Sequence, residues 1–211
     1  MAKLPNIIRT HRVRVICEGY EDEAYFKRLM GFNLWDKSYQ FFPVNAKGAS
    51  NIPARFQADY QNDAYEIILI FCDTDKAPYR EYKQVKYKIN KFLNKLKASE
   101  KLIMYANPCT MQIILSHFGD VSLKNQGKKT NADIIEKLTG VKGYDAHDYQ
   151  INDICNQVFQ RTYSEMKERV RAINYPDTTS CSTNFIVFLE RFESDDAKWI
   201  SDINKYLKEN K

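Results

Sequence analysis

Two aspartates, Asp73 and Asp75, directly follow the most hydrophobic stretch of the chain, IILIFC at residues 67–72. Side chains two residues apart on an extended chain point to the same side, so both carboxylates are able to converge on one point. Like charges at such a separation repel each other unless a cation lies between them. The spacing therefore predicts a cation site at the end of a buried strand, and an ordinary surface turn is the alternative.

Two further acids follow an earlier strand-like segment. Glu18 closes the alternating residues 12–17, and Asp22 comes four positions later. Hard carboxylate oxygens with no histidine nearby favour Mg²⁺ or Mn²⁺ over zinc. We therefore expect Glu18, Asp22, Asp73 and Asp75 to bind the metal, with Glu18, Asp73 and Asp75 catalytic. For Asp22 the alternative is an acid in the first turn of a helix, where the helix dipole favours it.

Strand-like and helical segments alternate in the first half of the chain. The expected strands are 12–17, 39–44, 65–72 and 101–105, and the expected helices are 22–31, 52–60, 80–98 and 110–118. This alternation predicts an α/β fold with a parallel sheet and helices on both faces. Ligands of such sheets bind beyond the carboxyl ends of the strands. Glu18, Asp73, Asp75 and Asn107 all fall at that edge.

The character of the chain changes after Gly119. We expect a catalytic domain at residues 1–118 and a helical cap at residues 119–211. The cap should begin with a mobile basic loop at 124–130 that closes over substrate. Helices are expected from Thr130 as the N-cap to Gly140, and at 151–172, 184–192 and 196–207.

Positive charge is concentrated in one segment. Residues 76–101 contain nine lysines and arginines and two glutamates, which gives this segment a net charge of +7. The net charge of the whole chain is +5, so the remaining residues together carry −2. Basic residues beside a carboxylate site suit an enzyme that holds nucleic-acid phosphates. We expect Lys47, Lys76, Lys86 and Lys91 to bind substrate. The alternatives are a solvated helix face for the basic segment and a simple turn around Lys47.

Composition limits the class of protein. The 211 residues are 44% hydrophobic and 28% charged, with no apolar run long enough to span a membrane and no apolar leader at the N-terminus. Five scattered cysteines without a CxxC pair favour reduced thiols and a cytoplasmic location over a disulfide frame or a zinc site. His117, Trp35 and Trp199 are expected to be core residues.

Several motifs resemble the Toprim family, the fold shared by topoisomerases, bacterial primases, the ribonuclease that matures 5S RNA and the overcoming-lysogenisation-defect (OLD) nucleases. That family has a glutamate closing its first strand and a DxD pair closing a later one, as in VICEGYED and IFCDTD here. The segments EGYEDEAYF, NPCTMQIILSHF and STNFIVFLERF resemble, in order, three segments of RloB-like Toprim proteins of phage-defence loci. One departure is that Thr110-Met111 occupies the place of a phenylalanine and a glutamate.

This resemblance implies a metal-dependent nuclease of bacterial anti-phage defence that cleaves RNA, such as tRNA, or DNA. It implies nucleic acid as a partner, and it points to a protein partner such as an ATPase encoded at the same locus and to a homo-oligomer. A Toprim scaffold that binds nucleic acid or a nucleotide without cleaving it is the alternative, favoured by Met111. A haloacid-dehalogenase-type phosphatase, which also has DxD after a strand, fits less well because its motif lies on the first strand.

Overall fold

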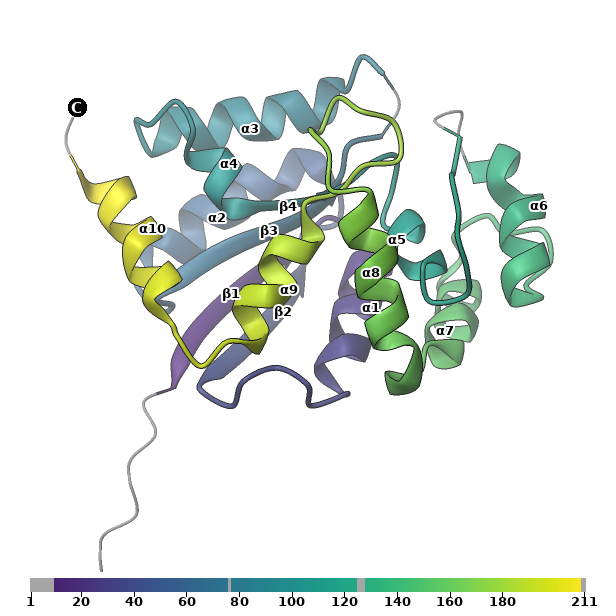
Figure 1. Cartoon of the computed structure of the whole chain (residues 1–211). Helices are drawn as coiled ribbons and strands as arrows, with labels where there is room; N and C mark the ends of the chain where they lie inside the picture. The colour runs from purple at the N-terminus through teal and green to yellow at the C-terminus, as the bar shows by residue number, and fades with distance from the viewer. Residues whose placement is uncertain (1–9, 76, 125–127, 210–211) are drawn as a thin grey trace, which may run out of the picture.

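The structure, a computed structural model, describes residues 10–75, 77–124 and 128–209. One four-stranded sheet forms its centre, with every pair of neighbouring strands parallel and the order β2-β1-β3-β4 (Figure 1). The strands are β1 (His11–Cys17), β2 (Tyr39–Asn45), β3 (Ile67–Asp73) and β4 (Ile103–Ala106). The predicted parallel α/β fold is therefore confirmed.

Helices cover both faces of the sheet, which explains the continuous hydrophobic sequence of its central strand. Six of the seven residues of β3 are buried, as expected for a strand with both faces covered. The helices α1 (Tyr20–Met30) and α9 (Phe185–Glu193) lie against one face. On the other face lies α2 (Ile52–Gln61), with α3 (Arg80–Phe92) beside it (Figure 1).

Aromatic side chains join the second half of the chain to the sheet. Phe185 of α9 stacks on Phe71 of β3, with ring centroids 5.1 Å apart. Phe192, at the other end of α9, contacts Phe41 at 4.7 Å and Phe26 at 6.1 Å. Each such pair contributes about 0.5–1.5 kcal/mol beyond the burial of its area. Helix α9 is thus part of the core of the sheet, while the expected division after residue 118 stays a prediction.

The remaining elements lie around this core. They are η1 (Ala49–Asn51), α4 (Ala98–Leu102), α5 (Met111–Leu115), α6 (Lys128–Thr139), α7 (Asp148–Gln157), η2 (Gln160–Thr162), α8 (Tyr163–Ala172) and α10 (Lys198–Lys208). Helix α7 packs on α1, and α8 packs on α9. None of the helices in the described ranges has the length and apolar character that crossing a membrane requires.

The long helix expected at 151–172 is wrong, because the structure has two helices there. Helix α7 ends at Gln157, and Val158 is extended at φ −77° and ψ 118°. The Val158 carbonyl accepts a hydrogen bond from Arg28 Nε of α1 at 2.8 Å, in place of a hydrogen bond within a helix. This tertiary contact outweighs the helical pattern of the sequence.

The helix expected at 80–98 also ends early. Helix α3 stops at Phe92, and Asn94 takes a left-handed conformation with φ +50°. The Asn90 side chain then donates to Leu96 O at 2.7 Å and accepts from Ser99 N at 2.8 Å, which holds the turn into α4. Leu96 lies in this turn and is 81% exposed.

Two predictions for the middle of the chain differ from the structure. The helix expected at 110–118 is the short α5 followed by turns. Thr130 is not an N-cap, because α6 already begins at Lys128, although that helix does end before Gly140, whose φ is +76°. Residues 125–127 of the expected mobile loop lie outside the described residues.

Two of the three predicted core residues, His117 and Trp35, are buried, whereas Trp199 is only partly buried against the core. His117 is 3% exposed, and its two ring nitrogens lie 3.0 Å from Tyr25 Oη and 2.8 Å from Thr162 Oγ1. Burial lowers the pKa of His117 to about 3, so the ring is neutral and structural. Trp35 donates to Tyr163 Oη at 3.0 Å, and the half-buried Trp199 donates to Tyr39 Oη at 2.9 Å.

Candidate active site

The order of the strands places a crevice at one point of the sheet edge. From β1 the chain passes to β2 on one side, while β3 lies on the other side of β1. Parallel sheets bind ligands at such a switch point, beyond the carboxyl ends of the two strands that flank it. Glu18 directly follows β1, and Asp73 is the last residue of β3. Both acids therefore lie at the position that the topology favours.

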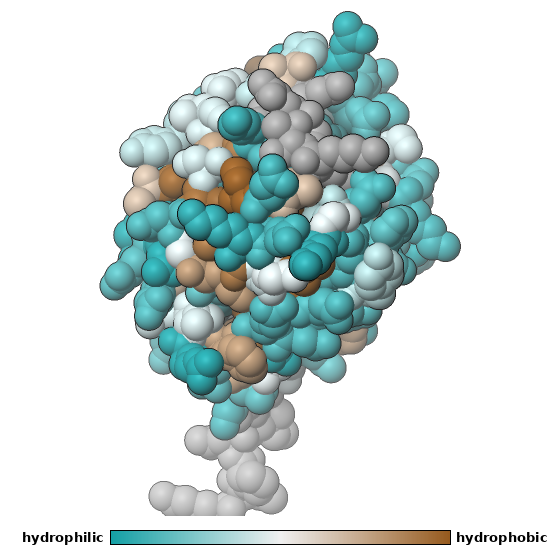
Figure 2. Space-filling model, turned by 90° about the vertical axis from the view of Figure 1, so that its right-hand side faces the viewer, coloured by the Kyte–Doolittle hydropathy of each residue, from teal (hydrophilic) through white to brown (hydrophobic). Residues whose placement is uncertain are grey.

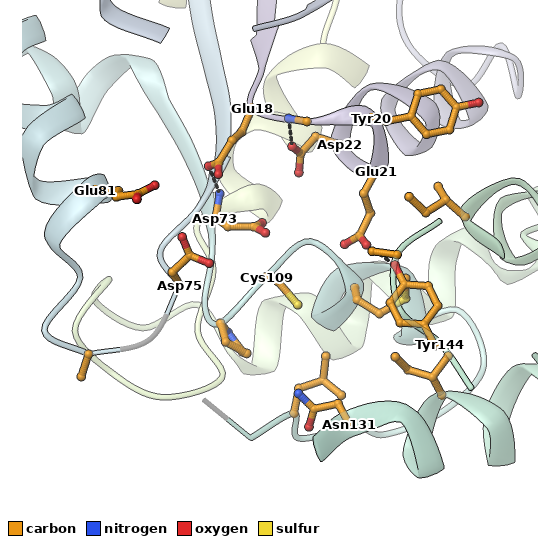
Figure 3. A pocket seen from close by; sticks show the side chains of 18 of the residues that line it. Glu18, Tyr20, Glu21, Asp22, Asp73, Asp75, Glu81, Cys109, Asn131 and Tyr144 are labelled. Atoms are coloured by element: carbon orange, nitrogen blue, oxygen red, sulfur yellow. Dashed lines mark hydrogen bonds between the residues drawn. The ribbon is translucent and has the colours of Figure 1, made fainter. Parts of the chain in front are cut away.

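A cleft of about 710 Å³ opens at this switch point. Figure 3 shows Glu18, Asp73 and Asp75 close together on one side of it, with Asp22 reaching in from α1 and Glu81 pointing toward them from α3. The sequence predicts that the first four acids gather at one edge, and the structure brings them together there. Glu21, Cys109, Asn131 and Tyr144 line the opposite side, together with several apolar side chains (Figure 3).

Backbone hydrogen bonds fix Glu18 between the strand ends. Its N–H donates to Phe71 O at 2.9 Å, and its carbonyl accepts from Gly48 N at 2.8 Å. Its carboxylate oxygen Oε2 accepts from Asp73 N at 3.2 Å. Gly48 has φ +116°, a conformation that favours glycine, and so lets the 45–51 loop approach the strand end.

Thr110 connects two of the acids. Its N–H donates to Asp73 Oδ1 at 2.7 Å, and its hydroxyl lies within hydrogen-bonding distance of Asp22 Oδ1 and, at 3.1 Å, of Asp73 Oδ1. The other oxygen of Asp22 accepts from Gly19 N at 2.8 Å. Because both oxygens of Asp22 already accept hydrogen bonds, Asp22 is better suited to orienting its neighbours than to binding a cation directly.

Asp75 reaches the cleft through an unusual backbone conformation. Its φ is +57°, in the left-handed region that aspartate tolerates better than most residues. Its N–H donates to Pro108 O at 3.1 Å, which ties the turn after β3 to the segment after β4. The carboxylate then points toward Asp73 (Figure 3).

Burial and mutual repulsion make these carboxylates hard to ionise. Burial, followed by the charges of Asp22 and Asp75, raises the pKa of Glu18 to about 8. Burial raises the pKa of Asp22 to about 7, opposed by the bonds from Thr110 and Gly19. Burial and the charges of Asp22 and Glu18 raise the pKa of Asp73 well above its usual range. A cation at this point would offset all three effects.

The carboxylate oxygens of the site are the type of ligand that a hard divalent cation prefers. Within residues 10–75, 77–124 and 128–209, no three histidine, cysteine, aspartate or glutamate side chains are arranged to hold a metal ion. Mg²⁺ usually keeps several waters and takes only one or two carboxylates together with substrate phosphates. Glu18 and Asp73 meet that need, since Glu18 Oε1 and Asp73 Oδ2 accept no hydrogen bond within the described residues.

Of the lysines expected to bind substrate, the three within the described residues do not line the cleft. Lys86 lies 2.5 Å from Asp177, which also accepts from Tyr82 at 3.0 Å, so Lys86 links α3 to the 174–184 loop. Lys91 is exposed on α3, and the exposed Lys47 does not line the cleft either. Lys76 lies outside the described residues. Arg80 is the one lysine or arginine that lines the cleft within the described part of the chain.

Two other positions differ from the expectation for the strand ends. Asn107 is fully buried, and its amide donates to Asp177 O at 3.0 Å and Thr179 O at 2.8 Å, away from the acids. Thr110 was identified in the sequence only as a departure from the RloB-like pattern. Its position four residues after the end of β4 was the one signal that could have placed it beside Asp73.

Comparisons with known proteins add no identification. No family model, no curated protein and no solved structure matches this chain. The resemblance of its motifs to RloB-like Toprim proteins therefore stays a prediction from the sequence.

Proposed function

We propose that this protein is a nuclease that depends on Mg²⁺ or Mn²⁺ and cleaves phosphodiester bonds of RNA or DNA. One observation carries the proposal. The carboxylates of Glu18, Asp22, Asp73 and Asp75 converge beside one cleft at the switch point of a parallel sheet. Clusters of acids that hold a divalent ion beside a polar substrate are a common basis for phosphoryl-transfer chemistry.

The charge of the cleft argues for a cation. Six acids line it, and the described part of its lining contains one arginine. The acids are Glu18, Glu21, Asp22, Asp73, Asp75 and Glu81. A negatively charged phosphodiester would be repelled from such a surface unless positive charge were bound there first. The acidic lining therefore supports the proposal that a phosphodiester binds here together with a divalent ion.

Each of the chain's own groups has a distinct task in this proposal. Glu18 and Asp73 would hold the ion, with Asp75 beside them, and the bound ion would supply Lewis-acid stabilisation of the charge on the phosphate oxygens. Glu18, whose carboxylate lies beside Asp73 at the end of the neighbouring strand, would also exchange a proton with the attacking water. Thr110 and Asp22 are positioning residues that fix the orientation of Asp73.

The biological setting of the proposal comes from the sequence resemblance. RloB-like proteins occur in phage-defence loci, so we propose a cytoplasmic defence nuclease that acts with a partner protein such as an ATPase, or as a homo-oligomer. The second candidate is a binding module that does not cleave. It is favoured by Met111, which replaces the glutamate of the RloB-like pattern and lines the same cleft.

A cleavage assay distinguishes these candidates. Labelled tRNA, single-stranded RNA and plasmid DNA are incubated with the wild-type protein in Mg²⁺, Mn²⁺ or EDTA, with Asp73→Asn purified in parallel. We expect cleavage of at least one substrate by the wild type with metal, and none with EDTA or with Asp73→Asn. Equal cleavage by both proteins would indicate a contaminant, and binding without cleavage would favour the binding module.

A further inference from the structure

Helix α3 starts at the cleft and leads away from it along the surface of the protein. Its first residue, Arg80, lines the cleft, and α4 packs on the helix. Figure 1 shows α3 at the top of the view, running from the carboxyl ends of the strands toward α4. Hydrophilic side chains cover most of the face at which the strands end, with smaller hydrophobic patches between them (Figure 2). The surroundings of the cleft therefore favour a charged ligand over an apolar one.

One side of α3 fixes the helix to the rest of the protein. Tyr82, Val85 and Ile89 are each at most 5% exposed. The Tyr82 hydroxyl donates to Asp177 at 3.0 Å, and Lys86 lies 2.5 Å from the same carboxylate. Lys86 therefore belongs to the anchored side of the helix. These contacts also fix the direction in which the opposite side faces.

The opposite side of α3, which we call the basic face, is formed by exposed side chains. They are Arg80, Lys83, Tyr87, Lys88 and Lys91. At 3.6 residues per turn, Arg80, Tyr87 and Lys91 lie within about 20° of one line along the helix, and the two other lysines flank that line. With a rise of 1.5 Å per residue, the face extends roughly 16 Å from the cleft.

The four cations of the basic face have no acidic partner in the described part of the chain. No carboxylate there lies within 4.0 Å of their side-chain nitrogens. The one acid of the helix, Glu81, points toward the carboxylates of the cleft (Figure 3). Like charges on one surface repel each other, and a bound polyanion relieves that repulsion. The charge of this face is therefore complementary to a phosphate backbone.

Tyr87 adds an aromatic surface between these cations. It is 59% exposed, and Lys91 Nζ lies 6.0 Å from the centre of its ring. Proteins that bind single-stranded nucleic acid combine cations for the backbone with aromatic rings on which bases stack. The bases of a duplex are already stacked and paired, so their faces do not reach such a ring. The basic face therefore favours a single strand over a duplex.

We infer that the basic face of α3 binds the backbone of a single-stranded segment of the nucleic-acid substrate, with one base stacked on Tyr87. This inference rests on the proposed function and names the form of its substrate. Arg80 belongs both to the cleft and to the basic face, so one strand passes from the carboxylates onto the helix. The cleft receives the phosphodiester that is cleaved, and the basic face supplies affinity for the phosphates beside it.

The salt dependence of binding tests the contacts to phosphate. The anisotropy of a labelled single-stranded RNA, and of a DNA of the same sequence, is measured over a range of salt concentrations with a fixed concentration of Ca²⁺ in place of Mg²⁺. For single strands, the slope of log K against log salt is about −0.7 per phosphate contact. The double variant Lys83→Gln/Lys91→Gln should therefore make the slope shallower by about 1.4. That change corresponds to about 25-fold weaker binding at 0.1 M salt when the affinities agree at 1 M.

The double variant Lys37→Gln/Lys198→Gln is the matched control. Both lysines are exposed, one just before β2 and the other at the start of α10, near the amino ends of the strands. The control removes the same charge from the opposite end of the sheet, so its slope and affinity should stay close to those of the wild type. An equal loss in both double variants would show a general effect of net charge and would overturn the assignment to α3.

Substitution of Tyr87 tests the single-stranded form of the ligand. Tyr87→Ala should raise the dissociation constant for the single strand about 5- to 100-fold, the range given by the loss of one stacked base. Tyr87→Phe keeps the ring and should retain the affinity of the wild type. Neither variant should change the binding of a duplex of the same sequence, which we expect to be weaker than that of the single strand. Circular dichroism shows whether the variants are folded.

The outcomes separate this inference from the proposed function. An unchanged slope in Lys83→Gln/Lys91→Gln, or no binding of either single strand by the wild type, would overturn the inference even if metal-dependent cleavage is found. A shallower slope together with weaker binding by Tyr87→Ala would support it, even if no cleavage is detected in Mg²⁺ or Mn²⁺. A shallower slope with full affinity in Tyr87→Ala would overturn the single-stranded form of the ligand.

Discussion

Glu18→Gln should stabilise the metal-free protein. The substitution removes the charge, keeps nearly the same shape, and leaves an amide oxygen that still accepts from Asp73 N. The folded state raises the pKa of Glu18 from its ordinary value of 4.5 to about 8. Between these two values the folded protein binds more protons than the unfolded chain, so the free energy of unfolding falls as the pH rises.

The size of the effect follows from the same two values. pH 7 lies about 2.5 units above 4.5, the ordinary pKa of Glu18. Because each unit corresponds to about 1.4 kcal/mol, Glu18 lowers the free energy of unfolding at pH 7 by at most about 3 kcal/mol. For a chain of this length, each 1 kcal/mol changes Tm by roughly 2–4 °C, so Glu18→Gln should raise Tm by up to about 6–12 °C at pH 7. The difference between variant and wild type should vanish as the pH approaches 4.5.

Thermal unfolding in EDTA, followed by circular dichroism from pH 4.5 to pH 8, measures this difference. Comparing Glu18→Gln with the wild type at each pH cancels the titrating groups that Glu18 does not influence, such as the buried His117. The pKa of Asp73 should fall in the variant, because the charge of Glu18 helps to raise it, and this adds to the stabilisation. Glu190→Gln is the matched control, because Glu190 pairs with Arg171 on the surface with 52% of its side chain exposed, and its change should alter Tm little. A Glu18→Gln protein that is less stable than wild type at pH 7 would refute the reasoning, because Glu18 would then be a structural residue.

Three further predictions test other parts of the site. Thr110→Val should cost about 1–3 kcal/mol in the free energy of unfolding and reduce cleavage, because it removes the hydroxyl that bonds the buried Asp22 and links it to Asp73, and Thr110→Ser should keep stability and cleavage close to wild type. Lys86→Glu should lower the free energy of unfolding by about 2 kcal/mol, because it places a carboxylate beside Asp177. Lys91→Glu should change that free energy by less than about 0.5 kcal/mol, and urea titration measures both. Mg²⁺ at about 100 times its dissociation constant should stabilise the wild type by about 2.7 kcal/mol and Asp73→Asn far less, as Tm with Mg²⁺ and with EDTA would report.

The strands and the gathering of the acids could be predicted because they depend on local pattern and on topology. The hydrophobic run before Asp73 and the alternation before Glu18 identify two strands of a parallel sheet, and parallel strands place their carboxyl ends at one edge. The breaks in the two long helices could not be predicted. They depend on Arg28 bonding Val158 O and on Asn90 bonding the turn at Leu96, which are contacts that no periodicity records.

The partners of the site residues were harder to foresee. The sequence places lysines after the DxD pair, yet Lys86 turns to Asp177, 91 residues further along the chain, and so serves the structure instead of the cleft. Thr110 is 37 residues from Asp73 and 88 from Asp22, and only the folded chain brings its hydroxyl near both. Long-range pairs of this kind depend on side-chain geometry and leave no mark on composition or spacing.

The central claim is that carboxylates at the ends of β1 and β3 hold the divalent ion of a nuclease. X-ray diffraction from crystals soaked in Mn²⁺, recorded where manganese scatters anomalously, locates such an ion directly. We expect an anomalous difference peak between Glu18 and Asp73 in the wild type, and its loss in Asp73→Asn crystals grown and soaked in the same way. Wild-type crystals with no peak at these carboxylates, in Mn²⁺ at a concentration that supports cleavage in solution, would contradict the claim.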